Sequence, residues 1–183
     1  MNYVFLAPGF EEIEAVTPID VMRRGGMQVT TVAVTTDGSK AVTGAHGVTY
    51  TADTDIASVD LSAAEWLVLP GGMPGATNLH DCAKLTDALR AHAAKGGWLA
   101  AICASPAVVL GSLGLLAGRS ATCYPGFENI CDGAEMTGAD VAVDGNIVTG
   151  NGPASALKWS LAILEAACGR EMASTVADGM LCK

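Results

Sequence analysis

Residues 96–118, GGWLAAICASPAVVLGSLGLLAG, decide the fold, because a short apolar run passes into a longer one with a cysteine at the junction. The stretch carries no charge. The lengths of its apolar runs, and the glycines and proline that interrupt them, predict a buried strand over residues 97–102 and a helix from about Ser105 to Leu116. Pro106 falls in the first turn of that helix, where no backbone donor is needed and the fixed φ of proline fits.

Cys103 lies at the junction, and the residues leave three interpretations open. Free N–H groups and the positive end of the helix dipole favour the thiolate, the form that attacks carbonyls and reacts with peroxide. A buried, inert cysteine fits the stretch equally well, because free cysteine is among the most buried residue types. A membrane-spanning helix would be long enough, but Pro106 and several glycines interrupt it.

The composition describes one compact domain over residues 1–183. Half of the residues are hydrophobic and 16% are charged, and the net charge is −9. This charge argues against binding to nucleic acid or to an anionic membrane, which both need clustered Lys and Arg. We expect a cytoplasmic protein, because no basic leader opens the chain. The six cysteines lack the spacing of a zinc site and are expected to be free thiols.

The order of the apolar segments predicts a mainly parallel α/β sheet. Residues 3–7 and 27–34 predict strands, and residues 11–24 between them predict a helix that Pro18 bends. This β-α-β unit favours a parallel sheet covered by helices. The remaining predicted elements are a hairpin or edge element within residues 35–59, a strand over 66–69, a helix over 81–95, a hairpin over 141–149, and helices over 154–168 and 170–178.

Three turns are candidates for a site, because sites in such sheets lie beyond the carboxyl ends of the strands. They are the acidic turn after Ala7, the glycine turn after Pro70, and Cys103. Glu11 and Glu12 are expected to be solvated. Glu14, between apolar neighbours, is expected to point inward, where burial beside a thiolate would keep it protonated.

The glycine turn PGGMPGA favours an oxyanion site over a phosphate site. It lacks the Lys-Ser/Thr ending of a P-loop, so we exclude a nucleotide. The N–H groups of Gly71 or Gly72 could approach a reacting atom. His46, His80 and His92 all lie far from Cys103 in sequence, and His92 is expected on the exposed side of its helix.

Three motifs together resemble the ThiJ/PfpI superfamily, in its branch of the parkinsonism-associated deglycase and the bacterial relatives. They are AICASPAVVL, VLPGGMPGATNL and LAPGFEEIEAVTPIDVMRRGG, and the resemblance continues through NGPASALKWSLAILEA. It implies a flavodoxin-like three-layer sandwich with a cysteine nucleophile elbow, and a homodimer. It also implies Cys103 as nucleophile, Glu14 as its protonated partner, and the N–H groups of Gly72 and Ala104 as oxyanion donors.

The chain departs from the family pattern at three positions. Ala104 stands where the protease-like branch has histidine, which argues against a peptidase. Tyr124 stands where relatives often have another histidine, and His46 where they place an arginine near the partner subunit. With Gly71, these last two residues are the expected substrate contacts.

The resemblance implies a glyoxalase or deglycase that acts on small dicarbonyls, or on their protein or nucleotide adducts, with no metal or organic cofactor. The alternative is an oxidative-stress sensor or chaperone, in which Cys103 is oxidised to a sulfinic acid.

Overall fold

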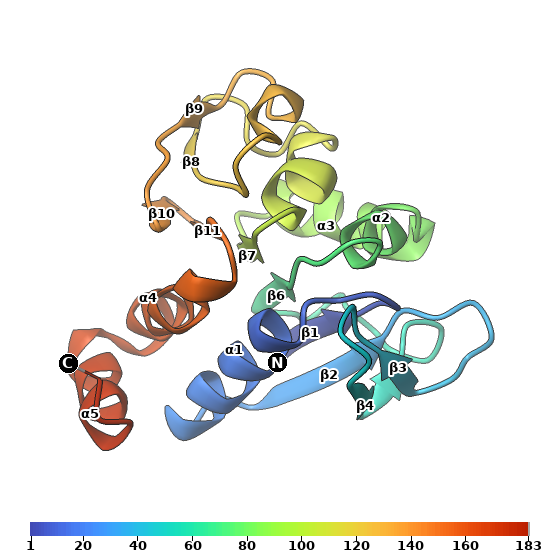
Figure 1. The fold of residues 1–183 in the computed structure, drawn as a ribbon, viewed down its shortest axis with the longest axis horizontal. Coiled ribbons are helices and arrows are strands. Elements are labelled where there is room, and N and C mark those ends of the chain that lie inside the picture. Colours follow the sequence, from blue (N-terminus) through green and yellow to red (C-terminus); the bar gives the residue numbers. More distant parts are fainter. Residues whose placement is uncertain (183) are drawn as a thin grey trace.

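The computed structural model describes residues 1–182, which form a central sheet with helices on both faces (Figure 1). Seven strands lie in the order β10-β11-β7-β6-β1-β2-β5. All neighbours pair in parallel except β10 and β11. The strands of the main sheet are β1 (Asn2–Leu6), β2 (Val29–Ala33), β5 (Thr54–Asp55), β6 (Trp66–Leu69), β7 (Trp98–Ile102), β10 (Val141–Asp144) and β11 (Ile147–Gly150). The predicted mainly parallel sheet is confirmed.

The other elements cover the sheet or extend from its edges. Two small sheets pair β3 (Ala41–Thr43) with β4 (Thr49–Thr51), and β8 (Ser120–Ala121) with β9 (Glu135–Met136). The helices are α1 (Glu12–Arg24), α2 (Gly75–His80), α3 (Ala83–Ala94), α4 (Ala156–Cys168) and α5 (Arg170–Gly179), and the short turns are η1 (Pro106–Gly111), η2 (Glu128–Ile130) and η3 (Pro153–Ser155).

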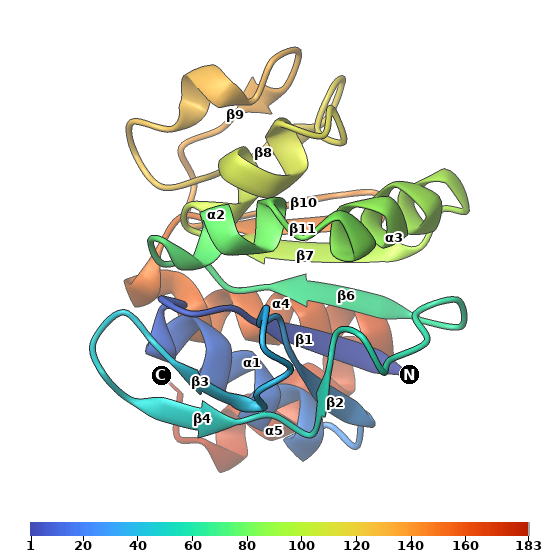
Figure 2. The same ribbon diagram turned by 90° about the vertical axis from the view of Figure 1, so that its right-hand side faces the viewer.

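The sheet is buried on both faces because alternate strand residues point to opposite layers. Val4, Leu6 and Ile102 pack with α1 and α4, whereas Phe5, Leu67 and Leu99 pack with α2, α3 and η1. Figure 2 shows α2 and α3 in front of the sheet and α1 and α4 behind it. This is the expected three-layer sandwich.

The stretch that decides the fold contains a strand and a short helix. β7 begins one residue later than predicted, and the helix ends at Gly111 instead of Leu116. η1 is a single π-helical turn, and Gly114 and Gly118 adopt left-handed φ values of 71° and 74°, which the helix does not tolerate. In the part of the chain that the structure describes, no helix is long and apolar enough to cross a membrane.

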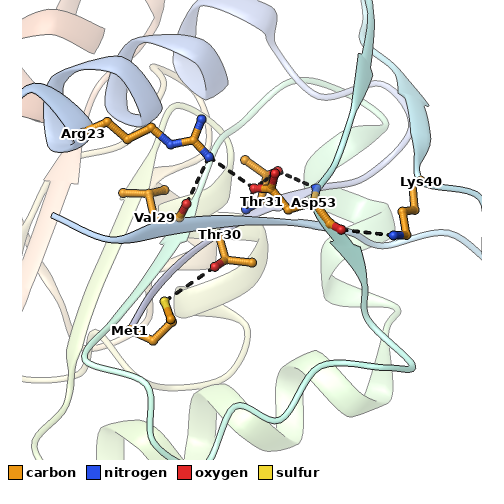
Figure 3. A network of polar contacts seen from close by, with 7 residues as sticks. All are labelled: Met1, Arg23, Val29, Thr30, Thr31, Lys40 and Asp53. Carbon is orange, nitrogen blue, oxygen red and sulfur yellow. Dashed lines mark hydrogen bonds and ion pairs between the residues drawn. The ribbon is translucent and has the colours of Figure 1, made fainter.

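A polar network joins the far end of α1 to the edge of the sheet (Figure 3). Asp53 Oδ2 accepts hydrogen bonds from the Thr31 N–H and hydroxyl groups, both at 2.8 Å, and from Arg23 at 3.2 Å. Arg23 also donates to the Val29 carbonyl at 3.0 Å. These contacts fasten the segment before β5 to β2.

His92 is buried, so the prediction that it is exposed is wrong. Its side chain is 8% exposed, and Nε2 lies 3.2 Å from the carbonyl oxygens of Glu65 and Trp98. The ring packs over Gly97, where any Cβ atom would collide with it. His92 therefore stabilises the amino end of β7, whereas Cys103 follows the carboxyl end of the same strand.

Candidate active site

Cys103 forms a sharp bend between β7 and η1. Its φ is 64°, in the left-handed region that residues with a side chain seldom adopt. The backbone is held on both sides, because Cys103 N–H donates to Gly150 at 2.9 Å and Tyr124 N–H donates to the Cys103 carbonyl at 2.8 Å. This bend is the elbow that the resemblance implied, a geometry that presents a nucleophile at the end of a strand.

The side chain of Cys103 borders a cavity of about 250 Å³. Segments far apart in the sequence line it: Glu11, Gly72, Met73, Cys103, Ala104, Tyr124, Phe127 and Pro153. The acidic turn, the glycine turn and the cysteine turn therefore meet, as their positions at the strand ends predicted.

Glu14 reaches this site from the inner face of α1. The residue is fully buried, as expected, and Oε2 accepts a hydrogen bond from Gly71 N–H at 2.9 Å. The carboxyl group lies next to the Cys103 side chain, because both would touch a Cβ atom placed at Gly71. Oε1 has no partner among residues 1–182. Glu14 is thus anchored through one oxygen and leaves the other free.

Glycine is required at position 71 by this close packing. A Cβ atom there would lie 2.7 Å from both Cys103 Cβ and Glu14 Oε2. Gly72 has a φ of 87°, and a Cβ atom would collide with the Glu11 backbone. The Ser105 hydroxyl donates to the Pro70 carbonyl at 2.6 Å, which fastens the glycine turn to the cysteine elbow.

The electrostatics couple the two ionisable groups. Burial raises the pKa of Glu14 to about 7, against the hydrogen bonds from Cys103 and Gly71. Burial also raises the pKa of Cys103 to about 12, the Glu14 charge acts in the same direction, and the N–H groups of Gly72 and Ala104 oppose both. Above pH 7, the pair therefore carries one negative charge and one proton between the carboxylate and the sulfur.

Of the interpretations that the sequence left open for Cys103, this environment favours a protonated thiol over a thiolate. The N–H groups of Gly72 and Ala104 act to lower the pKa of the sulfur. Their effect on the pKa is smaller than that of burial, because the sulfur is enclosed and Glu14 is its nearest charge. The proton that leaves Cys103 has an adjacent acceptor in Glu14.

The three expected substrate contacts lie in different positions. Tyr124 is 45% exposed and forms part of the cavity wall. Gly71 does not line the cavity, and its N–H group is used by Glu14. His46 lies one layer farther out, with Nε2 at 3.1 Å from Glu11 Oε2.

Glu11 and Phe127 are cavity residues that the sequence reasoning missed. Glu11 was expected to be solvated, yet its side chain is only 13% exposed. Its position at the start of α1, directly above the glycine turn, is set by the hydrogen bond from Glu11 N–H to the Gly71 carbonyl. Tyr124 and Phe127 line another part of the cavity, with ring centroids 6.3 Å apart. Two aromatic residues this close in the sequence were the signal that could have pointed to this wall.

Glu11, Glu12 and His46 are the residues with metal-ligand chemistry next to the site. One potential ligand atom from each lies within 4.8 Å of the others. Glu12 Oε1 already accepts the N–H groups of His46 and Val48, at 2.8 and 3.3 Å. This cluster fastens the β3–β4 hairpin to the start of α1.

Comparisons with known proteins agree with this fold. The model of the DJ-1/PfpI family matches residues 2–166. Among solved structures, oxidised DJ-1 of Toxoplasma gondii is 40% identical and superposes with a TM-score of 0.93, over 98% of this chain and 96% of that chain.

Two curated relatives extend the comparison. Protein DJ-1 homolog B of Arabidopsis thaliana is 37% identical over 96% of this chain, and the chain spans 40% of the length of that relative. A Caenorhabditis elegans relative named glutathione-independent glyoxalase DJR-1.2 is 30% identical over 91% of this chain and 87% of its own length.

Proposed function

Because the chain belongs to the DJ-1/PfpI family, we propose that it is a cysteine-dependent glyoxalase that converts a small dicarbonyl such as methylglyoxal into a hydroxy acid. The observation that carries this proposal is the position of the buried Glu14 carboxyl group next to Cys103, which borders a small open cavity. The glyoxalase name of the Caenorhabditis elegans relative supports the same activity.

The first step forms a bond between the Cys103 sulfur and the aldehyde carbon. Glu14 accepts the thiol proton as the bond forms, and the carbonyl oxygen takes up a proton to give a hemithioacetal. The N–H groups of Gly72 and Ala104 lie beside the sulfur and stabilise the negative oxygen during this addition.

The second step moves hydrogen within the bound substrate. Glu14 removes the proton from the former aldehyde carbon and returns a proton to the neighbouring carbon, which leaves a thioester of the hydroxy acid. Water then cleaves the thioester and restores the Cys103 thiol. The sum is dicarbonyl plus water to hydroxy acid, without an external oxidant or reductant. An adduct of a dicarbonyl on a protein or nucleotide would enter at the first step, after its own amine or thiol takes up a proton and leaves, which regenerates the aldehyde that Cys103 attacks.

The test measures lactate formed from methylglyoxal by purified protein, with and without a chelator. We expect turnover in both conditions and its loss in Cys103→Ser, because oxygen is the weaker nucleophile at this position. Chelator-insensitive turnover that persists in the Cys103→Ser variant would refute the proposal.

A redox-sensor function is the second candidate. The N–H groups of Gly72 and Ala104 and the Glu14 carboxyl group surround the sulfur and could hold the oxygens of a sulfinate. A gain of two oxygen atoms at Cys103 after mild peroxide, with negligible turnover of methylglyoxal, would favour this function over the glyoxalase. A peptidase has no such support, because no imidazole lines the cavity within the described residues.

We also propose that the chain forms a homodimer through the outer face of α1. Ile13 and Val16 are 55% and 46% exposed on consecutive turns, and the adjacent hairpin exposes Val48 at 58%. An exposed apolar face of this kind favours association. Sedimentation should show a dimer for the parent chain and a monomer for the double variant Ile13→Asp and Val16→Asp. A monomeric parent would overturn the proposal.

A further inference from the structure

The wall of the cavity beside Cys103 carries a carboxyl group. Glu11 is one of the lining residues, and its side chain is only 13% exposed. Among the described residues that line the cavity, none is Lys, Arg or His. Much of the remaining wall is apolar, with Met73, Phe127 and Pro153. A ligand that enters this cavity therefore meets a carboxylate and no cationic side chain of the described lining.

The backbone holds Glu11 against the glycine turn. Glu11 N–H donates to the Gly71 carbonyl at 3.0 Å, and a Cβ atom at Gly72 would collide with the Glu11 backbone. The same turn packs against the elbow, since a Cβ atom at Gly71 would lie 2.7 Å from Cys103 Cβ. The start of α1 and the elbow are thus joined through one turn, which sets the position of Glu11 at the cavity.

The other contact of the Glu11 side chain lies outside the cavity. Oε2 is 3.1 Å from Nε2 of His46, whose side chain is 70% exposed and does not line the cavity. His46 therefore contacts Glu11 from the solvent side. The charge of Glu11 also acts to raise the pKa of Glu14, so its field extends to the position where a carbonyl substrate reacts.

We propose that Glu11 determines the substrate class, so that the site admits small uncharged α-oxoaldehydes and discriminates against those that carry an anionic group. This inference rests on the glyoxalase function proposed above. Like charges repel more strongly at a partly buried site than in water, because the effective dielectric constant is lower there. A repulsive group of this kind gives selectivity against one class of substrate without any new attraction to the other.

Two α-oxoaldehydes with the same carbon chain test the proposal. 2-Oxopentanal and 4,5-dioxopentanoate share the reacting carbons, and their chains end in a methyl group and a carboxylate group, respectively. In the parent chain, kcat/KM should be higher for 2-oxopentanal. In Glu11→Gln, the ratio of the two kcat/KM values should fall by about tenfold, the effect expected from one charge at the wall of so small a cavity.

The ratio isolates the charge of Glu11 from its other effects. Both compounds react through Cys103 and Glu14 in the same way, so a change in the pKa of Glu14 or in the shape of the elbow cancels in the ratio. A ratio that is the same in the parent chain and in Glu11→Gln would overturn the proposal.

Glu12→Gln is the matched control. It removes the same charge one residue along α1, but Glu12 is not among the residues that line the cavity, and its Oε1 accepts N–H groups of the β3–β4 hairpin segment. The ratio should change by less than about twofold in this variant, because water and salt screen a charge outside the cavity. An equal fall in both variants would assign the selectivity to the net charge of −9 and would also overturn the proposal.

A second measurement does not depend on turnover, so it separates this inference from the proposed function. Iodoacetamide and iodoacetate alkylate a thiol by the same displacement of iodide, and only iodoacetate is an anion. Peptide mass spectrometry gives the ratio of the two rates at Cys103. This ratio should fall by about tenfold in Glu11→Gln, and the ratio at the exposed Cys168 should not change.

The two measurements together distinguish the possible failures. Absence of methylglyoxal turnover with the expected change in the alkylation ratio would refute the glyoxalase and keep the selectivity of the site for uncharged reagents. An alkylation ratio at Cys103 that Glu11→Gln leaves unchanged would overturn the inference, and so would a Cys103 that neither reagent labels.

Discussion

Two carboxylates near opposite ends of α1 show how the same group is used in contrasting ways. Asp53, in the network of Figure 3, has one oxygen that accepts three hydrogen bonds, from Thr31 twice and from Arg23 once. Glu14 is fully buried, with one backbone donor, the Cys103 thiol nearby, and one oxygen without a hydrogen-bond partner in the described part of the chain.

The protonation equilibria follow from these surroundings. Burial acts to raise the pKa of Asp53, but hydrogen bonds from Thr31 and the charge of Arg23 bring it below its usual value. The pKa of Glu14 rises to about 7, because its hydrogen bonds do not compensate for its burial. A carboxylate with compensating partners strengthens the fold, whereas one without them exchanges protons near neutral pH.

The largest expected effect separates the two carboxylates by activity. Glu14→Gln removes the proton acceptor next to Cys103 and should lower turnover of methylglyoxal by about 10²–10⁴-fold, the usual contribution of a general base. Asp53→Asn is the matched control and should keep turnover within a factor of two or so, because it lies outside the cavity. Equal losses in both variants would show that the comparison fails.

The pH profile of turnover sharpens the role of Glu14. The Glu14–Cys103 pair must lose one proton before the sulfur can attack, and the pKa of Glu14 is about 7. Turnover should therefore rise about tenfold per pH unit below pH 7 and level off above it. A profile already flat from pH 5 upwards would show that the pair ionises as an ordinary carboxyl group does.

The two carboxyl groups should make the stability of the parent chain depend on pH with opposite signs. The pKa of Glu14 rises on folding from 4.5 to about 7, so the folded chain holds a proton that the unfolded chain has lost. The contribution of Glu14 to the free energy of unfolding is fully present below pH 4.5 and falls by roughly 3 kcal/mol as the pH rises to 7. Urea unfolding at pH 5 and pH 8 should show this loss in the parent chain and not in Glu14→Gln.

The smallest effect concerns Asp53. Its pKa is lowered on folding, so its contribution is present above pH 3.8 and is lost as the pH falls through the folded-state value. Since the side chain is half exposed, we expect Asp53→Asn to lower the free energy of unfolding by about 1 kcal/mol at pH 7. Urea unfolding should show that this difference shrinks as the pH falls below 3.8, and a difference that does not change with pH would assign it to packing.

Sequence patterns predicted the elements better than they predicted the site environments. β6 matched its predicted range because a continuous apolar run between turns has few alternatives. Leu85, Leu89 and His92 share one helix face, so the burial of His92 was available from periodicity. Its acceptors, the carbonyl groups of Glu65 and Trp98, could not be found that way.

The candidate site was likewise easier to locate from the sequence than to describe in its contacts. That the three turns meet followed from the parallel topology. The burial of the Glu11 side chain, in contrast, depends on how the glycine turn folds against α1. The shift in the Cys103 pKa comes first from the burial of the sulfur and then from the charge of Glu14, and no local spacing specifies either. The helix after Cys103 is shorter than predicted because Gly114 and Gly118 adopt left-handed φ values, which the apolar pattern around them did not indicate.

The backbone of Cys103 has a consequence for synthesis of the chain. Its N–H and carbonyl groups are bonded to Gly150 and Tyr124, which leave the ribosome later than Cys103 itself. A growing chain therefore lacks both bonds that hold Cys103 in its left-handed bend until β11, which carries Gly150, has been made. The elbow is thus among the last features of the sheet to be completed during synthesis.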